Sequence, residues 1–252
     1  MTNHLFDYYV SEQNQFFSGW DFSHLSKLGR FGSSLLPWSY GSLALSMIKD
    51  SEAVLDMGTG GGEFFSRLQP FPKIVYATEG YAPNLEIARN RLKPLGVHVV
   101  SFEDDRHIPL PTNTFDLILN QHDSFCVKEL ARLLKKGGTF LTQQVGGLDC
   151  RDLNAALGAD IDQTYSGWNL SSALNMFSKT SLEIDDAQEH VGTQRFYDVG
   201  AVIYYLHAIP WQVPDFSVQT YEHSLRKIHE RIEQCGYIDF TQHRFLIKAT
   251  RT

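Results

Sequence analysis

A glycine-rich segment carries the clearest chemical signal in the sequence. A short apolar run at residues 54–57 leads into a turn that holds four glycines between positions 58 and 62. Such a turn between a strand and a helix is typical of nucleotide-binding sites, because backbone amides reach the ligand where side chains would block the approach. We expect the helix to begin near Glu63. The segment predicts cofactor contacts from Asp56, Gly58, Thr59, Gly60 and Gly62.

The spacing of these glycines separates two kinds of nucleotide. In the dinucleotide fingerprint G-x-G-x-x-G, the third glycine would fall at position 63, which is occupied by Glu63. Asp56 precedes the turn, and its carboxylate would repel a pyrophosphate but attract a ligand with an ammonium and a sulfonium group. We therefore expect S-adenosylmethionine as the cofactor. An NAD-dependent oxidoreductase is a disfavoured alternative.

Acidic residues recur after the next two predicted strands. Glu79 follows a run at residues 73–78, roughly 20 residues beyond Asp56, an offset at which a carboxylate can accept hydrogen bonds from ribose hydroxyls. Asp104 follows a run at residues 97–102, where a carboxylate can accept from an adenine amino group. Ligands bind at the carboxyl ends of strands in open α/β sheets, so both positions predict cofactor contacts.

Strands and helices alternate around these residues. Further strands are expected at residues 115–120 and 139–145, and apolar residues at helical spacing lie between the runs. This alternation predicts an α/β protein with a parallel sheet covered by helices on both faces. Beyond Gly147 we expect helices over residues 169–179, 199–208 and 218–235, and strands over residues 182–191 and 240–249.

Composition narrows the classes of partner. The net charge of −7 argues against DNA or bulk RNA as a partner, since phosphate-binding surfaces are basic. No apolar stretch is long enough for a membrane helix, and no secretory signal is present, so we expect a cytoplasmic protein. Three widely spaced cysteines indicate neither a disulfide framework nor a metal site. An RNA substrate is the alternative, and it predicts a local basic patch formed by Arg226, Lys227, Arg231 and Arg244.

Segments 54–62, 77–81, 104–116 and 129–138 resemble class I S-adenosylmethionine-dependent methyltransferases. They are most similar to the group that includes ubiquinone/menaquinone-biosynthesis and ribosomal RNA guanine-N1 methyltransferases. The resemblance implies a methyltransferase with a Rossmann-like, doubly wound and mostly parallel seven-stranded sheet whose last strand is antiparallel. It divides a single domain into an amino-terminal helical cap, a cofactor-binding core and an acceptor-side region with a helical insertion, at residues 1–50, 51–147 and 148–252.

The resemblance also implies roles for residues outside the glycine-rich loop. Tyr81, beside Gly80, would stack on adenine, and Asp104 with the amide of Asp105 would read the adenine edge. Asn120 and Gln121 would lie beneath the sulfonium. The chain departs from the RNA-modifying relatives because it has no cysteine-rich zinc module at its amino terminus, which disfavours an RNA substrate.

Methyl transfer needs an acceptor aligned about 3 Å from the methyl group, and a base only if the acceptor must lose a proton. His122, just after the strand at residues 115–120, is the candidate base; hydrogen bonding to Asp123 or to a backbone carbonyl is the alternative. We expect a small-molecule acceptor. A non-catalytic S-adenosylmethionine-binding module is an alternative function.

Aromatic residues cluster in the two segments that flank the predicted core. The expected acceptor pocket is lined by Trp38, Tyr40, Tyr197, Tyr204 and Trp211, with packing in the apolar core as the alternative. Trp20, together with Trp38 and Tyr40, is expected to form a lid over the cofactor or to pack beneath the first helix of the core.

Overall fold

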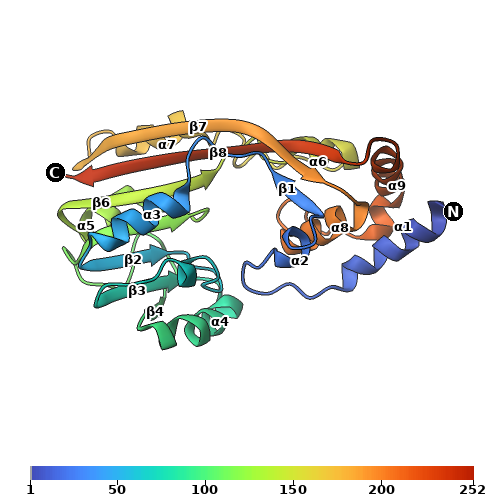
Figure 1. Ribbon diagram of the computed structural model, residues 1–252. Coiled ribbons are helices and arrows are strands. Elements are labelled where there is room, and N and C mark those ends of the chain that lie inside the picture. The colour runs from blue at the N-terminus through green and yellow to red at the C-terminus, as the bar shows by residue number, and fades with distance from the viewer. Residues whose placement is uncertain (1) are drawn as a thin grey trace.

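An eight-stranded sheet runs through the computed structural model, which describes residues 2–252 and side chains from residue 4 onward (Figure 1). The strand order is β1-β7-β8-β6-β5-β2-β3-β4. The bounds of the strands are β1 Phe31–Ser33, β2 Ala53–Met57, β3 Ile74–Glu79, β4 His98–Ser101, β5 Phe115–Gln121, β6 Leu134–Val145, β7 Leu182–Phe196 and β8 Ile238–Arg251.

Strands β2 to β6 form the parallel half of the sheet. β2 pairs with β3 and β5, β3 with β4, and β5 with β6, all in parallel. Every residue of β2 is buried, as expected for a strand covered on both faces. The carboxyl ends of these strands therefore meet at one edge, which places Asp56, Glu79 and Gln121 near one another in the sheet. The predicted α/β architecture is confirmed.

Strands β7 and β8 form the antiparallel half. β8 pairs antiparallel with β6 and β7, as expected for the last strand of the sheet. β1 pairs antiparallel with β7, with Phe31 opposite Phe196. The sheet thus has one strand more than the seven expected, because a three-residue strand is too short to show an alternating pattern and forms through its distant partner.

Helices divide the molecule into two lobes. In the core lobe, helices α3 (Tyr40–Lys49), α4 (Ala82–Leu92), α5 (Val127–Leu133) and α7 (Leu170–Phe177) cover the sheet. In the outer lobe, α1 (Thr2–Val10), the short α2 (Ser23–Ser26), α6 (Arg151–Leu157), α8 (Val199–Ala208) and α9 (Val218–Cys235) gather around the far ends of β7 and β8 (Figure 1). No described helix combines the length and the apolar character that a membrane crossing requires.

The ends of the outer-lobe helices follow their local sequence. Asp198 caps α8 by accepting a hydrogen bond from the backbone N–H of Ala201, and Ser217 caps α9 in the same way. Gly236 ends α9 in a left-handed conformation. Arg30 joins the amino-terminal segment to α8, since its Nη2 lies 2.7 Å from Asp198 Oδ1. The expected helices at residues 199–208 and 218–235 are confirmed.

The expected helix after the glycine-rich turn is wrong. Only a short 3-10 helix at Phe65–Arg67 follows Glu63. Pro70 lies shortly beyond it, and proline cannot continue an α-helix because it lacks an N–H group and clashes with the preceding turn. The glycine-rich loop therefore has no long helix behind it and no sizeable helix dipole that would attract a phosphate.

Candidate functional site

The glycine-rich loop needs glycine for its backbone shape. Gly58, Gly60 and Gly62 have φ angles of 65°, 62° and 77°, in the left-handed region that other residues avoid. At Gly58 the carboxylate of Asp123 also occupies the space that a Cβ atom would need. The loop is therefore closely packed against the segment that follows β5.

Three carboxylates gather around this loop. Asp56 in β2 and Glu79 at the end of β3 are each 6% exposed, and Asp123 lies over Gly58. Burial, together with the charges of Asp123 and Glu79, raises the pKa of Asp56 to about 7. Burial also raises the pKa values of Glu79 and Asp123. None of the three forms an ion pair with a lysine or arginine of the described chain, so the loop lies in buried negative charge that a cation would relieve.

A cavity of about 500 Å³ lies beside Glu79, on the side predicted to hold adenine. Its lining includes Gly80, Phe102 and Asp104. The Glu79 carboxylate accepts a hydrogen bond of 2.7 Å from the backbone N–H of Tyr81, whose ring is mostly exposed. The structure therefore places Glu79, Gly80 and Asp104 on one cavity, with Tyr81 beside it.

The Asp104 side chain is already engaged within the protein. It accepts hydrogen bonds of 2.9 Å from the side-chain Nε and the backbone N–H of Arg106. These bonds hold the pKa of Asp104 well below its usual range. Contact between Asp104 and an adenine amino group stays a prediction, as does the contact from the amide of Asp105.

Asn120 and Gln121 occupy the end of β5, but their side chains differ in freedom. Asn120 is fully buried, and its Oδ1 accepts hydrogen bonds of 2.7 Å from Thr142 and from Gln144. Its side chain thus joins β5 to β6. Gln121 is only partly buried. The backbone of both residues lies at the end of β5, as expected. Their position beneath a sulfonium stays a prediction.

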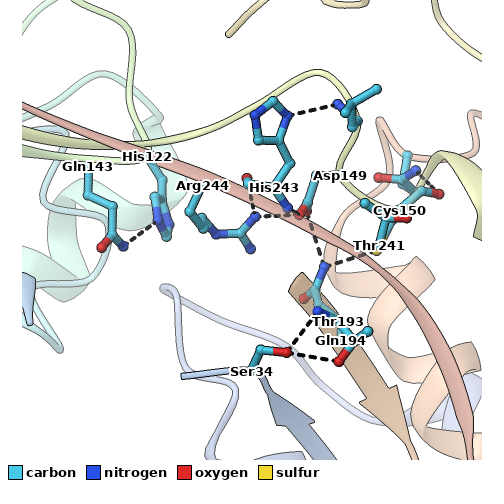
Figure 2. Close-up of polar contacts among 12 residues, drawn as sticks. Ser34, His122, Gln143, Asp149, Cys150, Thr193, Gln194, Thr241, His243 and Arg244 are labelled. Carbon is cyan, nitrogen blue, oxygen red and sulfur yellow. Dashed lines mark hydrogen bonds and ion pairs between the residues drawn. The ribbon is translucent and has the colours of Figure 1, made fainter. Parts of the chain in front are cut away.

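His122 is held in a hydrogen-bonded chain with two residues from other elements. Its Nε2 accepts a hydrogen bond of 3.0 Å from the Gln143 side-chain amide, which in turn accepts one of 2.8 Å from Trp38 Nε1 (Figure 2 shows His122 and Gln143). Burial, together with the neighbouring Arg244 charge, lowers the pKa of His122 to about 3. His122 is therefore neutral near pH 7. The lone pair on its Nε2 is already used by the hydrogen bond from Gln143. These surroundings suit a positioning residue better than the predicted base, which stays untested.

Two of the predicted pocket aromatics lie near the loop. Trp38 is linked to His122 through Gln143. Tyr40 is buried near Asp56, and its pKa is raised mainly by burial and also by the Asp56 charge. The Tyr40 hydroxyl has no hydrogen-bond partner among the described residues. A buried hydroxyl without a partner is unfavourable, and a bound ligand could satisfy it.

The other predicted aromatics lie in or near the outer lobe. Tyr204 is buried there and packs against Phe17 and His24, and Tyr197 is partly exposed. Trp211 stacks on Trp20 with ring centroids 5.8 Å apart and planes 4° apart. The structure therefore does not gather the five predicted pocket residues in one place.

The sequence predicted Trp20 as part of a lid over the cofactor, but it did not predict Asp123 at the loop. A Cβ atom built on Gly60 would lie 3.2 Å from Trp20 Cβ, so Trp20 lies against the loop, and its role as a lid stays a prediction. Both contacts join residues that are far apart in the chain, so they depend on the tertiary structure and not on a local sequence pattern. Among the described residues, no cluster of histidine, cysteine or acidic side chains could hold a metal ion.

Comparisons with known proteins agree with this geometry. The family model described as "Methyltransferase domain" matches residues 55–142. No curated protein matches the sequence. The matched residues run from β2 through most of β6 and include the loop, Glu79 and His122.

Solved structures share the fold at low sequence identity. A proposed methyltransferase from Bacillus halodurans C-125 aligns with a TM-score of 0.59 at 20% identity, over 83% of this chain and 97% of its own. The YcgJ protein from Bacillus subtilis aligns with a TM-score of 0.52 at 18% identity, over 83% and 98%. The [4+2]-cyclase SpnF aligns with a TM-score of 0.52 at 15% identity, over 84% and 80%.

These likenesses extend over both lobes, whereas the family model matches the core lobe alone. The model match and the Rossmann-like sheet agree on the same strands and the same glycine-rich loop. The family implies S-adenosylmethionine as the methyl donor. Residues 55–142 match a methyltransferase domain, and the chain shares the fold of the aligned structures.

Proposed function

We propose that this chain transfers a methyl group from S-adenosylmethionine to a small-molecule acceptor. One observation carries the proposal: Asp56, Glu79 and Asp123 surround the glycine-rich loop without a cation paired to any of them in the described chain. A ligand with an ammonium and a sulfonium group would relieve the repulsion between the three carboxylates. A dinucleotide pyrophosphate would add to it.

The cofactor's parts can be assigned to different residues. Its methionine end would lie over Gly58 and Gly60 beside Asp56, its ribose hydroxyls would donate to Glu79, and its adenine would enter the cavity of about 500 Å³ beyond Gly80. The hydroxyl of Tyr40, which has no hydrogen-bond partner among the described residues and is close to Asp56, would contact the methionine end.

The reaction needs little from the protein beyond position. When bound, the cofactor supplies an electrophilic methyl group on a cationic sulfur. The residues of this chain would have to hold the acceptor about 3 Å from that methyl group and in line with it. Trp38, Gln143 and neutral His122 form a fixed wall at the end of β5 that can orient the acceptor.

Calorimetry with S-adenosylmethionine tests the proposal. We expect binding by the wild-type chain, and at least tenfold weaker binding by Asp56→Asn and by Glu79→Gln, about 1.4 kcal/mol each. No binding by the wild type in the millimolar range would overturn the proposal, as would unchanged binding by both variants. An NADH titration on the same protein examines the oxidoreductase alternative.

The alternatives differ in what they predict for turnover. The [4+2]-cyclase SpnF shares this fold, so the fold alone does not establish methyl transfer. A non-catalytic module would bind S-adenosylmethionine but never release S-adenosylhomocysteine with any candidate acceptor. An RNA-modifying enzyme would label RNA from a radioactive methyl donor. The basic patch expected for RNA is incomplete, because Arg244 is largely buried against Asp149, away from the surface of α9.

A further inference from the structure

A band of polar side chains crosses the sheet where β7 and β8 pass from the core lobe to the outer lobe. Gln242 and Arg244 point to one face of β8, between Leu246 of the core-lobe cluster and Phe240 of the outer-lobe cluster. Gln194 of β7 pairs with Phe240 of β8, so its side chain lies on the same face of the sheet. Gln194 and Gln242 are buried, at 2% and 4% exposure. Burying polar groups between two apolar clusters costs free energy unless those groups are fully hydrogen-bonded.

This band is not fully satisfied by the protein. Gln242 Oε1 is buried and has no hydrogen-bond partner among the described residues. Arg244 uses only one of its three nitrogens: Nη1 donates to Asp149 Oδ1 and to the backbone carbonyl of His243, the latter at 2.8 Å. In the part of the chain that the structure describes, no hydrogen bond engages Arg244 Nε or Nη2.

Asp149 fixes the Arg244 guanidinium in place. Its Oδ1 also accepts a hydrogen bond of 2.8 Å from the backbone N–H of His243, and its Oδ2 accepts one of 3.2 Å from Gln194 Nε2 (Figure 2). The carboxylate oxygens are therefore filled from the protein. The arrangement holds the arginine rigid and leaves one edge of its planar fork unused, which is the geometry that binds a carboxylate or phosphate through two parallel bonds.

The guanidinium also lies next to the proposed reaction centre. Figure 2 shows Arg244 between His122 and Asp149, and the Arg244 charge is felt at His122, at the end of β5. An acceptor anchored on Arg244 would reach toward the Trp38–Gln143–His122 wall.

We infer that Arg244 anchors an oxyanion, a carboxylate or phosphate group, on the methyl acceptor, and that Asp149 is its positioning residue. The inference rests on the proposed function, since it assigns a substrate class to the same site. It narrows the small-molecule acceptor to an acidic one.

Fluorine NMR with matched probes tests the inference. In the presence of S-adenosylhomocysteine, 4-fluorobenzoate and 4-fluorobenzamide differ mainly in charge, and 4-fluorophenyl phosphate separates phosphate from carboxylate. We expect the wild type to bind at least one of the two anions ten or more times more tightly than the amide, and Arg244→Gln to abolish this preference. Arg244→Lys should retain part of it, because a lysine keeps the charge and loses the fork.

Arg244→Gln leaves Asp149 buried without its partner and could unfold the chain. The double variant Arg244→Gln, Asp149→Asn replaces the ion pair with two amides and avoids that cost. Arg195→Gln is the matched control, because Arg195 is paired with Asp239 on the outer lobe and should keep the preference.

Two results would overturn the inference: equal binding of anions and amide by the wild type up to about 10 mM, including no binding of either, or an anion preference that survives in the double variant. Calorimetry with S-adenosylmethionine on the same samples separates the two proposals. If the wild type binds the cofactor but shows no anion preference, only the role inferred for Arg244 is contradicted. A wild type that binds no cofactor contradicts the proposed function.

Discussion

The backbone N–H of Trp20 donates a hydrogen bond of 3.3 Å to Glu63 Oε2, which fastens the amino-terminal segment to the glycine-rich loop. The same carboxylate forms an ion pair with Arg91 of α4. Glu63 stands where the dinucleotide fingerprint requires glycine, and it links the cap, the loop and α4. The amino-terminal segment and the glycine-rich loop are therefore coupled through one side chain.

Trp20→Ala should weaken the cover over the loop. The Trp20 side chain lies against Gly60 and stacks on Trp211, so its loss opens the loop to water. We expect the dissociation rate of S-adenosylmethionine to rise about tenfold, as for other lids that retain a bound ligand. Stopped-flow fluorescence measures this rate. Trp211→Ala is the control: it removes the stack but leaves Trp20 over Gly60, and it should change the rate less. Equal rates in wild type and Trp20→Ala would exclude a lid.

Cofactor affinity should depend on pH through Asp56. Its pKa in the unliganded protein is about 7, and a bound cation requires the ionised form. Affinity should therefore fall about tenfold from pH 8 to pH 6. Asp56→Asn should bind weakly but with a flat profile over this range. Calorimetry at several pH values provides the test, and an Asp56→Asn profile as steep as that of the wild type would assign the effect to another group.

The same carboxylate should destabilise the unliganded fold at high pH. The pKa of Asp56 is higher in the folded chain than in the unfolded chain, so the folded state binds more protons between about pH 4 and pH 7. Stability should fall as pH rises through this window. We expect Asp56→Asn to raise the free energy of unfolding at pH 8 by about 4 kcal/mol, and by less than half of that at pH 5. Denaturant unfolding at the two pH values measures the difference; a stability gain that is the same at both would contradict it.

His122 should not titrate in the neutral range. Burial and the Arg244 charge hold its pKa at about 3, and its Nε2 accepts from Gln143. NMR of the imidazole resonances, with His122→Asn used to assign the signal, should show a neutral ring from pH 5 to pH 8. A midpoint between pH 6 and pH 7 would restore His122 as a candidate general base.

Gly58→Ala should abolish cofactor binding. An alanine there must adopt a φ of 65°, and its Cβ would collide with the Asp123 carboxylate. Gly96→Ala is a matched control, because Gly96 has a φ of 82° but nothing within 4 Å of a built Cβ. Both variants should lose about 1–2 kcal/mol of stability from the left-handed backbone, but only Gly58→Ala should lose S-adenosylmethionine binding. Thermal unfolding with and without the cofactor distinguishes them.

Local signals in the sequence determined much of this protein. The strand before Asp56, the glycine-rich turn, the acidic end of β3 and the helix at residues 218–235 all depend on contiguous residues and their spacing. One local inference failed: the stretch after Glu63 forms only a 3-10 helix before Pro70. Pro70 cannot continue an α-helix, so the usual strand–turn–helix unit does not form there.

Tertiary structure alone decided how the site is completed. Asp123 on Gly58, Trp20 on Gly60, and Arg244 beside His122 each join segments from different parts of the chain. β1 likewise becomes a strand only through its pairing with β7. The sequence by itself predicts which residues lie at a strand's end, because that depends on local backbone preference. Which side chains meet across the two lobes depends on the path of the chain, and so on the packing of the whole molecule.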